Sequence, residues 1–232
     1  MICHEYQYPY DLNTAEPAYQ ELVDRNQLSG PVVSKLSKDN ILLNTTKIHF
    51  SLFNTIGGSQ MTRPKTAESA KEQNTLHERL VYDSYDNYGN ILQYHQSLAT
   101  PAQPTAGDIN VGNSNIRYTS ILWGYENQLP IAKIENATYA AVVAALTSNG
   151  VTLTSLQSLD GQALIDALAV LRTALPDAFI TTYAYKPMVG ITHMQDARGL
   201  QTTYSYDAQN RLDEVRDHED NILSKNNYNY KQ

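Results

Sequence analysis

One short pattern recurs along this chain: an Asp is followed three residues later by Gly, Asn or Asp. Three copies lie close together near the end of the sequence, and a fourth lies far upstream. Internal repetition is typical of proteins built from successive copies of one supersecondary unit. The sequence therefore predicts a repeat protein. The first and fourth residues of the copies are Asp86 and Gly89, Asp196 and Gly199, Asp207 and Asn210, and Asp217 and Asp220.

The repeated pattern has the chemistry of a tight turn. Asp is favoured at the first position of a type I turn and Gly at the fourth, where the chain often becomes left-handed. Asn210 and Asp220 replace Gly in two copies, and both residue types tolerate a positive φ. The substitutions therefore indicate a requirement of the backbone, and we expect unusual φ values at Gly89, Gly199, Asn210 and Asp220.

Tyrosines occupy the segments between the turns. The chain has 17 Tyr against 3 Phe and 1 Trp, which suits rings that pack on one side while the hydroxyl stays wet. Several are two residues apart, so both rings of a pair lie on one face of a strand. Near Asp86 the tyrosines are instead three apart, which leaves that strand's register open. The predicted aromatic face comprises Tyr183, Tyr185, Tyr204, Tyr206, Tyr228 and Tyr230.

The remaining pattern predicts a mainly β protein of consecutive antiparallel hairpins with an α-helical insertion. Residues 1–135 form the first hairpin region, with a hairpin that turns at 44–47 and surface loops at 54–76 and 97–115. Residues 136–176 form the insertion, and 177–232 carry the repeats. In the insertion Asn136 is the expected N-cap, and a leucine stripe is expected to cover an edge or end of the sheet. A helix that binds a partner is the alternative. The stripe consists of Leu164, Leu168, Leu171 and Leu175.

The segment from Asp196 to Tyr230 reads D-x-R-G-x4-Y-x-Y-D-x-x-N-R-L-x-x-V-x-D-x-x-D-N-I-L-x4-Y-x-Y. This pattern resembles the YD repeat of bacterial RHS-repeat proteins. Residues 121–125 and 130–136 look like a segment upstream of the terminal repeats in some large RHS proteins. The resemblance covers about half of the chain, counted as elements and not as boundaries.

The resemblance implies a fold and a role. In that family the repeats are successive β-hairpins that coil into a long sheet. In toxin complexes and related toxins the sheet closes into a hollow shell around a C-terminal effector. A chain of 232 residues corresponds to a strip of such a sheet, and repeat units need neighbours to bury their faces. We expect the partner to be the rest of a longer RHS protein or another copy of the chain.

Composition excludes several other partners. The net charge is −7 without any basic run, which argues against nucleic acid and anionic membranes. The longest apolar run, residues 140–146, is far below the roughly 20 residues of a membrane span. Residues 1–5 lack the features of a secretory signal. The resemblance implies a secreted or cell-surface protein, while the missing signal leaves the cytoplasm open.

The sequence contains no recognisable catalytic, cofactor or metal motif. Cys3 has no partner for an internal disulfide, and the six histidines lack ligand spacing. The run Asp217–Asp220 fits no Ca²⁺ or Zn²⁺ pattern and is interpreted as a solvated turn. Asp196–Leu200 is similar to the self-cleavage element of RHS cores, but Ala197 replaces its Pro, so an ordinary turn is expected.

Two functions lead after these exclusions, and a self-cleaving toxin core, which spontaneous fragmentation near Leu200 would reveal, is the third. The first is a structural hairpin segment of RHS type, which is not an enzyme. The alternative is a carbohydrate-binding surface module, because an aromatic face flanked by Asp and Asn is suited to stacking on sugar rings.

Overall fold

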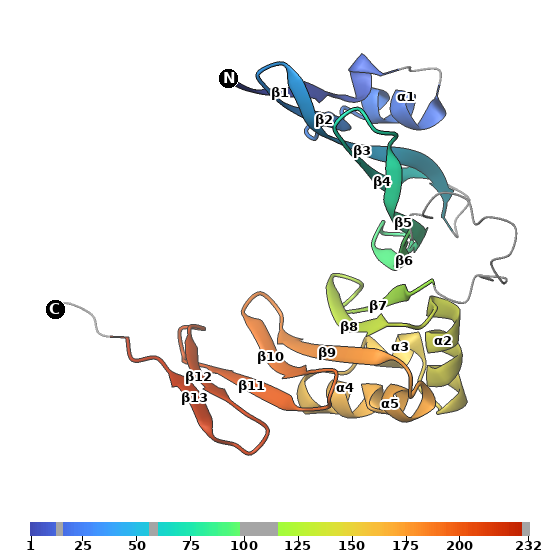
Figure 1. Cartoon of the computed structure of the whole chain (residues 1–232). Coiled ribbons are helices and arrows are strands. Elements are labelled where there is room, and N and C mark those ends of the chain that lie inside the picture. Colours follow the sequence, from blue (N-terminus) through green and yellow to red (C-terminus); the bar gives the residue numbers. More distant parts are fainter. Residues whose placement is uncertain (13–15, 56–59, 98–115, 229–232) are drawn as a thin grey trace, which may run out of the picture. The chain divides into compact units, whose positions relative to one another are not determined.

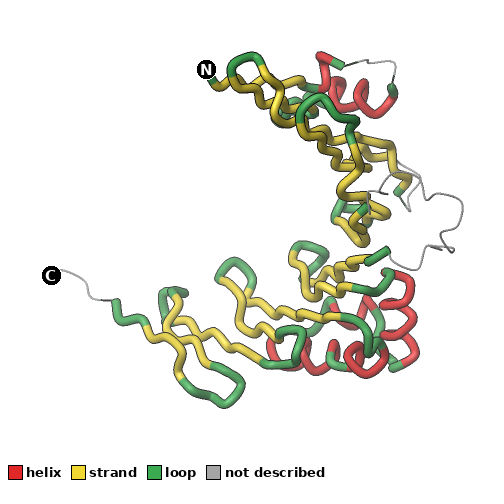
Figure 2. Tube along the Cα trace, in the orientation of Figure 1, coloured by secondary structure: helices red, strands yellow, loops and turns green. Residues whose placement is uncertain are grey.

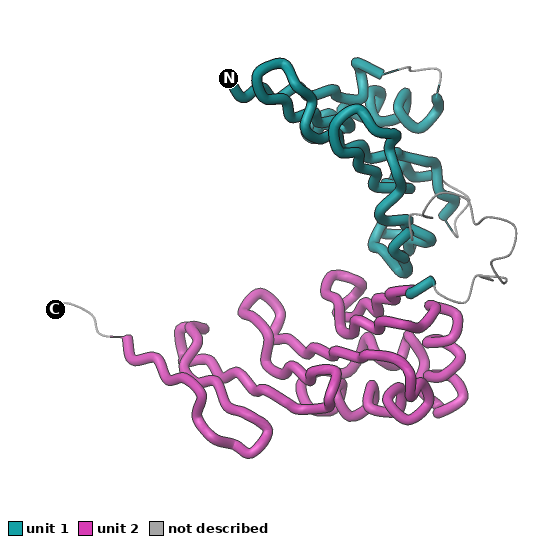
Figure 3. The backbone as a smooth tube through the Cα atoms, in the orientation of Figure 1, with its two compact units in different colours: residues 1–117 teal, residues 118–232 magenta. Residues whose placement is uncertain are grey.

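The computed structural model describes residues 1–12, 16–55, 60–97 and 116–228 (Figures 1 and 2). It divides into two compact units, residues 1–117 and 118–232 (Figure 3). Every strand pair described within either unit is antiparallel, and neighbouring strands follow one another along the chain. The predicted class, a mainly β protein of consecutive hairpins with a helical insertion, is confirmed.

The first unit is a sheet with one short helix beside it. The helix packs Tyr19 and Leu22 against Val32, Val33 and Phe50, which form a small core. The elements are β1 (Ile2–Gln7), η1 (Pro9–Asp11), α1 (Pro17–Asp24), β2 (Val33–Lys38), β3 (Ile41–Asn54), β4 (Gln60–Lys71), β5 (His77–Tyr85) and β6 (Ile91–Gln96).

Two predictions for this unit are wrong. Residues 41–54 form one continuous strand, β3, without the expected turn at 44–47. Most of the loop expected at 54–76 is strand β4, which pairs with β3 from Asn54↔Gln60 to Asn44↔Lys71. The polar composition concealed the strand, although Thr favours strands and period-2 alternation places Thr66 and Ala70, both buried, on one face. The loop expected at 97–115 lies almost wholly outside the described residues.

The second unit contains the helical insertion and the three copies of the repeated turn near the end of the sequence. The insertion connects β8 to β9, which are antiparallel neighbours with Glu135 opposite Phe179. The strands are β7 (Tyr118–Gly124), β8 (Leu129–Glu135), β9 (Phe179–Lys186), β10 (Gly190–Gln195), β11 (Gln201–Tyr206), β12 (Leu212–Arg216) and β13 (Ile222–Lys225). The helices are α2 (Tyr139–Ser148), α3 (Leu153–Leu156), α4 (Gly161–Leu168) and α5 (Val170–Ala174). The insertion therefore shares a unit with the strands on both sides of it.

The helices cover one face of this sheet (Figure 1). Leu164, Leu168 and Leu171 are fully buried with Ile134 and Ile180 in one core. The expectation that the leucine stripe covers an edge or end of the sheet is therefore wrong. The physical reason is the alternation in β9, which turns every second side chain toward the helices.

The first helix of the insertion begins later than expected. Thr138 is the N-cap of α2, and its hydroxyl oxygen accepts a hydrogen bond from the Ala141 N–H at 3.3 Å. Asn136 instead has a φ of 68°. Its side-chain amide donates to the Asp177 carbonyl at 3.0 Å, so it closes the base of the insertion. None of the helices within the described ranges is long and apolar enough to cross a membrane.

Replacing Leu168 with Ala should lower the free energy of unfolding by about 3 kcal/mol, because the side chain is fully buried and its removal leaves a cavity. Chemical denaturation measures the change. Leu223, which is 61% exposed, provides the matched control, and Leu223→Ala should change stability by under about 0.5 kcal/mol. Equal losses in the two variants would contradict the described core.

Candidate functional site

The four Asp turns share one set of hydrogen bonds. In each turn one carboxylate oxygen of the Asp, Oδ1, accepts the main-chain N–H groups of the second and fourth residues after it. This double acceptance holds the loop closed, as an Asx turn does. The N–H donors are Tyr88 and Asn90 for Asp86, Arg198 and Leu200 for Asp196, Gln209 and Arg211 for Asp207, and Glu219 and Asn221 for Asp217, all at 2.8 to 2.9 Å.

The fourth residue of every turn is left-handed. The φ values are 86° at Gly89, 86° at Gly199, 60° at Asn210 and 66° at Asp220. The N–H of each residue donates to the carbonyl of its turn's Asp at 2.9 to 3.1 Å. Glycine, Asn and Asp are the residues that accept this conformation at the lowest cost.

The second carboxylate oxygen of each Asp binds a side chain. Asn90, Arg198, Arg211 and Asn221 supply the donors in the four turns. The pKa of Asp196 is lowered, mainly by a hydrogen bond from the main-chain N–H of Leu200. The pKa values of Asp207 and Asp217 are also lowered, mainly by hydrogen bonds from the side chains of Arg211 and Asn221 respectively. These three turns therefore favour the ionised form of Asp196, Asp207 and Asp217.

A second repeated contact joins each of four strands to the strand before it. A tyrosine hydroxyl at the end of one strand, or for Tyr228 three residues beyond it, donates to a main-chain carbonyl of the preceding strand. The pairs are Tyr85 with Pro64 at 2.6 Å, Tyr185 with Pro130 at 2.9 Å, Tyr206 with Ile191 at 2.8 Å, and Tyr228 with Leu212 at 2.9 Å.

The accepting carbonyl always lies at a β-bulge. Each accepting strand has one extra residue in its pairing with the strand that precedes it in the chain. The carbonyl that binds the tyrosine belongs to the residue directly before this extra residue. A bulge disrupts the ladder locally, and the tyrosine hydroxyl binds the main-chain carbonyl at the point of disruption. The extra residues are Lys65, Ile131, Thr192 and Asp213.

Burial accompanies these tyrosine contacts. Desolvation raises the pKa of Tyr185 to about 12 and also raises the pKa of Tyr85 and Tyr206. Gly190 lies where a Cβ atom would come within 2.3 Å of the Tyr206 hydroxyl. A side chain at this position would displace the tyrosine from the carbonyl it binds.

The structure brings four tyrosines of the predicted face together. Met194 pairs with Tyr183 and with Thr202, so Tyr183, Tyr185, Tyr204 and Tyr206 share one face of β9 and β11. The helices cover the opposite face. All four side chains are half-buried, and the rings of Tyr183 and Tyr185 are 6.4 Å apart.

The other two predicted tyrosines differ. Tyr228 is 44% exposed, and the Arg211 guanidinium lies 4.2 Å from its ring centroid, a cation–π contact. Tyr230 lies outside the described residues.

One residue that the sequence did not single out joins the helices to the repeats. Arg172 of α5 donates to the carbonyls of Ile180 at 2.9 Å and Asp196 at 2.8 Å, and to that of Ala197 at 3.2 Å. Its Nε donates to the Gln195 side chain at 3.1 Å. Burial lowers the pKa of Arg172. No sequence motif marks this arginine, because its partners are main-chain groups of distant segments.

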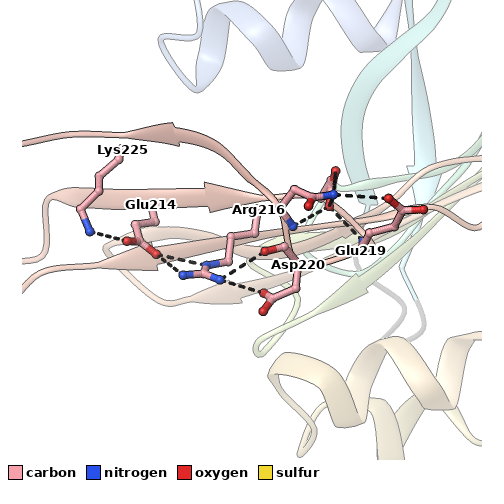
Figure 4. A network of polar contacts seen from close by, with 7 residues as sticks. Glu214, Arg216, Glu219, Asp220 and Lys225 are labelled. Atoms are coloured by element: carbon pink, nitrogen blue, oxygen red, sulfur yellow. Dashed lines mark hydrogen bonds and ion pairs between the residues drawn. The ribbon is translucent and has the colours of Figure 1, made fainter.

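A polar network connects the last two strands (Figure 4). The Glu214 carboxylate binds Lys225 at 2.5 Å and Arg216 at 2.8 Å, and Arg216 also pairs with Asp220 at 3.1 Å. Hydrogen bonds from Lys225 and then Arg216 lower the pKa of Glu214. The network ties β12, β13 and the turn between them together.

The described part of the chain contains no group of three His, Cys, Asp or Glu side chains placed to hold a metal ion. In the Asp217–Asp220 run the Asp217 oxygens accept hydrogen bonds from the turn itself, and Asp220 pairs with Arg216. These carboxylates are engaged in the fold of the turn.

Comparison with known proteins gives one structural similarity. No family model and no curated protein sequence matches the chain. A solved structure of the Photorhabdus luminescens Tc holotoxin pore matches 97% of this chain with 10% sequence identity and a TM-score of 0.39. The matched region is 10% of the toxin chain. Similarity at this level does not assign the toxin's fold or function to the present chain.

Gly199→Val should lower the free energy of unfolding by about 1 to 3 kcal/mol, because a β-branched residue is strained at a φ of 86°. No atom lies within 4 Å of the new Cβ position, so a clash does not contribute. Gly30 is equally open without a left-handed φ, which makes Gly30→Val the matched control.

Replacing the exposed His218 with Ala should leave the free energy of unfolding unchanged. Loss of a measured activity in His218→Ala alone would contradict a structural role for the turn.

Tyr206→Phe should cost about 1 kcal/mol of stability, because it leaves the bulge carbonyl of Ile191 without its donor. Tyr204 lies on the same face, and its hydroxyl forms no hydrogen bond with a described residue, so Tyr204→Phe should be near neutral. Urea denaturation of the two variants measures the difference. Equal stabilities would show that the hydroxyl contact does not hold the hairpins together.

Acid should weaken the Asp turns. The folded-state pKa of Asp217 lies below its unfolded value, so the carboxylate stabilises the fold above the unfolded value of about 3.9. This contribution disappears as the pH falls through the folded-state pKa. The melting temperature of wild type should therefore exceed that of Asp217→Asn at pH 7 and approach it near pH 2. Asp213→Asn, outside the turn, is the control. A difference that does not change with pH would contradict the assignment.

Proposed function

We propose that this chain is a structural β-hairpin segment of RHS type and that it forms part of a large secreted, cell-surface or toxin-shell protein. The observation that carries the proposal is the repeated tyrosine–bulge contact. Tyr185, Tyr206 and Tyr228 make the same contact and are 21 and 22 residues apart. That interval corresponds to one hairpin, so each hairpin is bonded to the one before it in the same way.

The Asp turns support the same role. Their carboxylates are used by the turn's own N–H groups and by neighbouring side chains. A group occupied in this way contributes to the shape of the backbone and is a poor candidate for chemistry on a substrate. The proposal therefore assigns no catalytic residue to the chain.

The partners in this proposal are further hairpins, either from the rest of a longer protein or from another copy. Repeat units bury their faces against neighbours and are stabilised by those interfaces. The tyrosine face is the surface that would serve the alternative, glycan binding. Two of its four hydroxyls, those of Tyr185 and Tyr206, already bind main-chain carbonyls, which supports packing as the main role of these rings.

Exchange of one turn for another tests the structural role. Gln209→Arg with Asn210→Gly converts Asp207–Asn210 into the Asp-Ala-Arg-Gly sequence of Asp196–Gly199. Because both turns have the same main-chain hydrogen bonds and both fourth residues are left-handed, the exchange should change the free energy of unfolding by under about 1 kcal/mol. Gln209→Arg with Asn210→Val is the control and should lose about 1 to 3 kcal/mol. Unfolding of the exchanged protein would contradict equivalent repeats.

Light scattering and thermal melting with a panel of neutral glycans separate the two functions. The structural proposal predicts self-association and no shift in melting temperature with any sugar. A monomer whose melting temperature rises with one glycan, and no longer does so after Tyr183→Ala with Tyr204→Ala, would overturn it in favour of the glycan-binding module.

A further inference from the structure

A cavity of about 550 Å³ lies beside the small core of the first unit. Three residues of that core, Leu22, Val32 and Phe50, form part of the cavity wall. Protein interiors are normally close-packed, with few voids larger than a water molecule. The core beneath α1 therefore has an open side. The other apolar residues of the wall are Pro9, Pro31, Ile48 and Pro64.

Hydrogen bonds fix the segments that form the wall. The Val32 N–H donates to the Gln7 carbonyl at 2.7 Å, and the Ile48 N–H donates to the Val32 carbonyl at 2.9 Å. The Thr62 hydroxyl donates to the Glu21 carboxylate, which joins β4 to α1. The cavity is therefore formed by fixed elements of the fold.

Much of the wall is buried. Leu22 and Thr62 are each 4% exposed, Val32 is 2% exposed, and Pro9 is also buried. The exposed residues of the wall lie mainly in the connection between α1 and β2, at positions 26–30. The cavity therefore has a buried floor and opens to solvent along this connection.

Among the described residues that line the cavity, Arg63 is the one cation, and none is acidic. The Arg63 Nη1 donates to the Thr62 carbonyl at 2.9 Å, and its Nε donates to the Gly89 carbonyl at 3.4 Å. Both acceptors are neutral, and within the described ranges Arg63 forms no ion pair. The nearby Glu21 carboxylate pairs with Arg25 at 2.6 Å. Arg63 is thus held in place with its charge uncompensated, and Nη2 and one hydrogen of Nη1 are left for an anion.

An apolar wall with one uncompensated guanidinium fits an apolar carboxylic acid. Removal of apolar surface from water favours binding of the ligand's chain, and a guanidinium binds a carboxylate through two parallel hydrogen bonds. A neutral hydrocarbon would leave the charge of Arg63 without a partner, while acetate would leave the wall in contact with water. Leu22, Val32 and Ile48 are aliphatic, which suits a flexible aliphatic chain.

The volume of the cavity limits the length of that chain. Pockets that bind small organic molecules have volumes of about 300–1,000 Å³, and this cavity lies within the range. A methylene group is similar in size to a water molecule, which takes about 30 Å³ in the liquid, so a chain of about ten carbons would fill more than half of the cavity.

We propose that this cavity binds a medium-chain fatty acid. Arg63 binds the carboxylate, and the chain lies against Leu22, Val32, Ile48 and Phe50, where it completes the small core. This binding is additional to the structural role of the hairpins and separate from the tyrosine face, since the wall belongs to η1, α1, β3, β4 and the connection between α1 and β2.

Calorimetric titration of the whole chain at fixed ionic strength tests the site. The probes are decanoate, octanoate, 1-octanol and acetate, each below the concentration at which it aggregates. We expect one decanoate per chain and no binding of acetate. Decanoate should bind about tenfold tighter than octanoate, because each buried methylene contributes about fourfold. Octanoate should bind about tenfold tighter than 1-octanol, because its hydrogen bonds to Arg63 are charge-assisted.

Three results of the titration would overturn the proposal. Decanoate that does not bind, or that binds without saturation, would show that the cavity is no site. Equal affinity for octanoate and decanoate would remove the chain from the cavity, and equal affinity for octanoate and 1-octanol would remove the carboxylate from Arg63.

A charge variant locates the carboxylate. Arg63→Gln should weaken octanoate binding by about tenfold, to the affinity of 1-octanol, and leave 1-octanol itself within about twofold. Lys47→Gln removes the same charge from the first unit outside the cavity and should leave both affinities within about twofold. Equal weakening of octanoate binding in the two variants would overturn the assignment of Arg63.

A wall variant that leaves Arg63 in place locates the chain, and it keeps the proposal testable if Arg63→Gln does not fold. Ile48 and Leu43 both lie on β3 and are 37% and 39% exposed, but Ile48 alone lines the cavity. Ile48→Ala should weaken decanoate binding by about fivefold, because it removes apolar contacts with the chain. Leu43→Ala, the matched control, should leave the affinity within about twofold. Equal effects of the two substitutions would overturn the proposal.

Discussion

The sheet depends on hydrogen bonds from tyrosine hydroxyls to main-chain carbonyls at its β-bulges. Each tyrosine contact described above lies at a bulge, where the regular ladder of the sheet is interrupted. A buried, unsatisfied carbonyl costs more than a typical hydrogen bond contributes. A tyrosine reaches this acceptor from the next strand, and its ring packs on the way. The bulge and the tyrosine are therefore one structural device that couples neighbouring hairpins.

The turns and the helices complete this arrangement from two sides. An Asp carboxylate closes each turn by binding main-chain N–H groups, so the chain returns at a fixed register. The insertion between β8 and β9 takes the place of a turn and covers one face of the sheet. Arg172 then binds main-chain carbonyls of β9 and of the Asp196 turn. The helices cover one face of the sheet, and the tyrosines of β9 and β11 lie on the opposite face.

Local chemistry decided which features could be predicted. The Asp turns were predictable because the hydrogen bonds that the Asp carboxylate makes to the main chain lie within five consecutive residues, and the left-handed residue is Gly, Asn or Asp each time. Strand β4 was missed because a polar composition resembles a loop, and only pairing with β3 makes it a strand. The turn expected at 44–47 is likewise absent, because these polar residues pair with β2 and β4 as part of strand β3. The N-cap of α2 is Thr138 and not the expected Asn136. The Asn136 side-chain amide instead donates to the Asp177 carbonyl, 41 residues away in sequence.

The sequence by itself determined the repeat, the positions of the turns and the pairing of tyrosines on one strand face, because each follows from φ preferences and the period of two. The tertiary structure alone decided which acceptor each tyrosine binds and which sheet face the helices cover. It also decided which distant main-chain groups surround Arg172. Those contacts join residues far apart in the chain, and their partners are carbonyls that every residue possesses. No side-chain pattern can mark such a partner before the strands are in register.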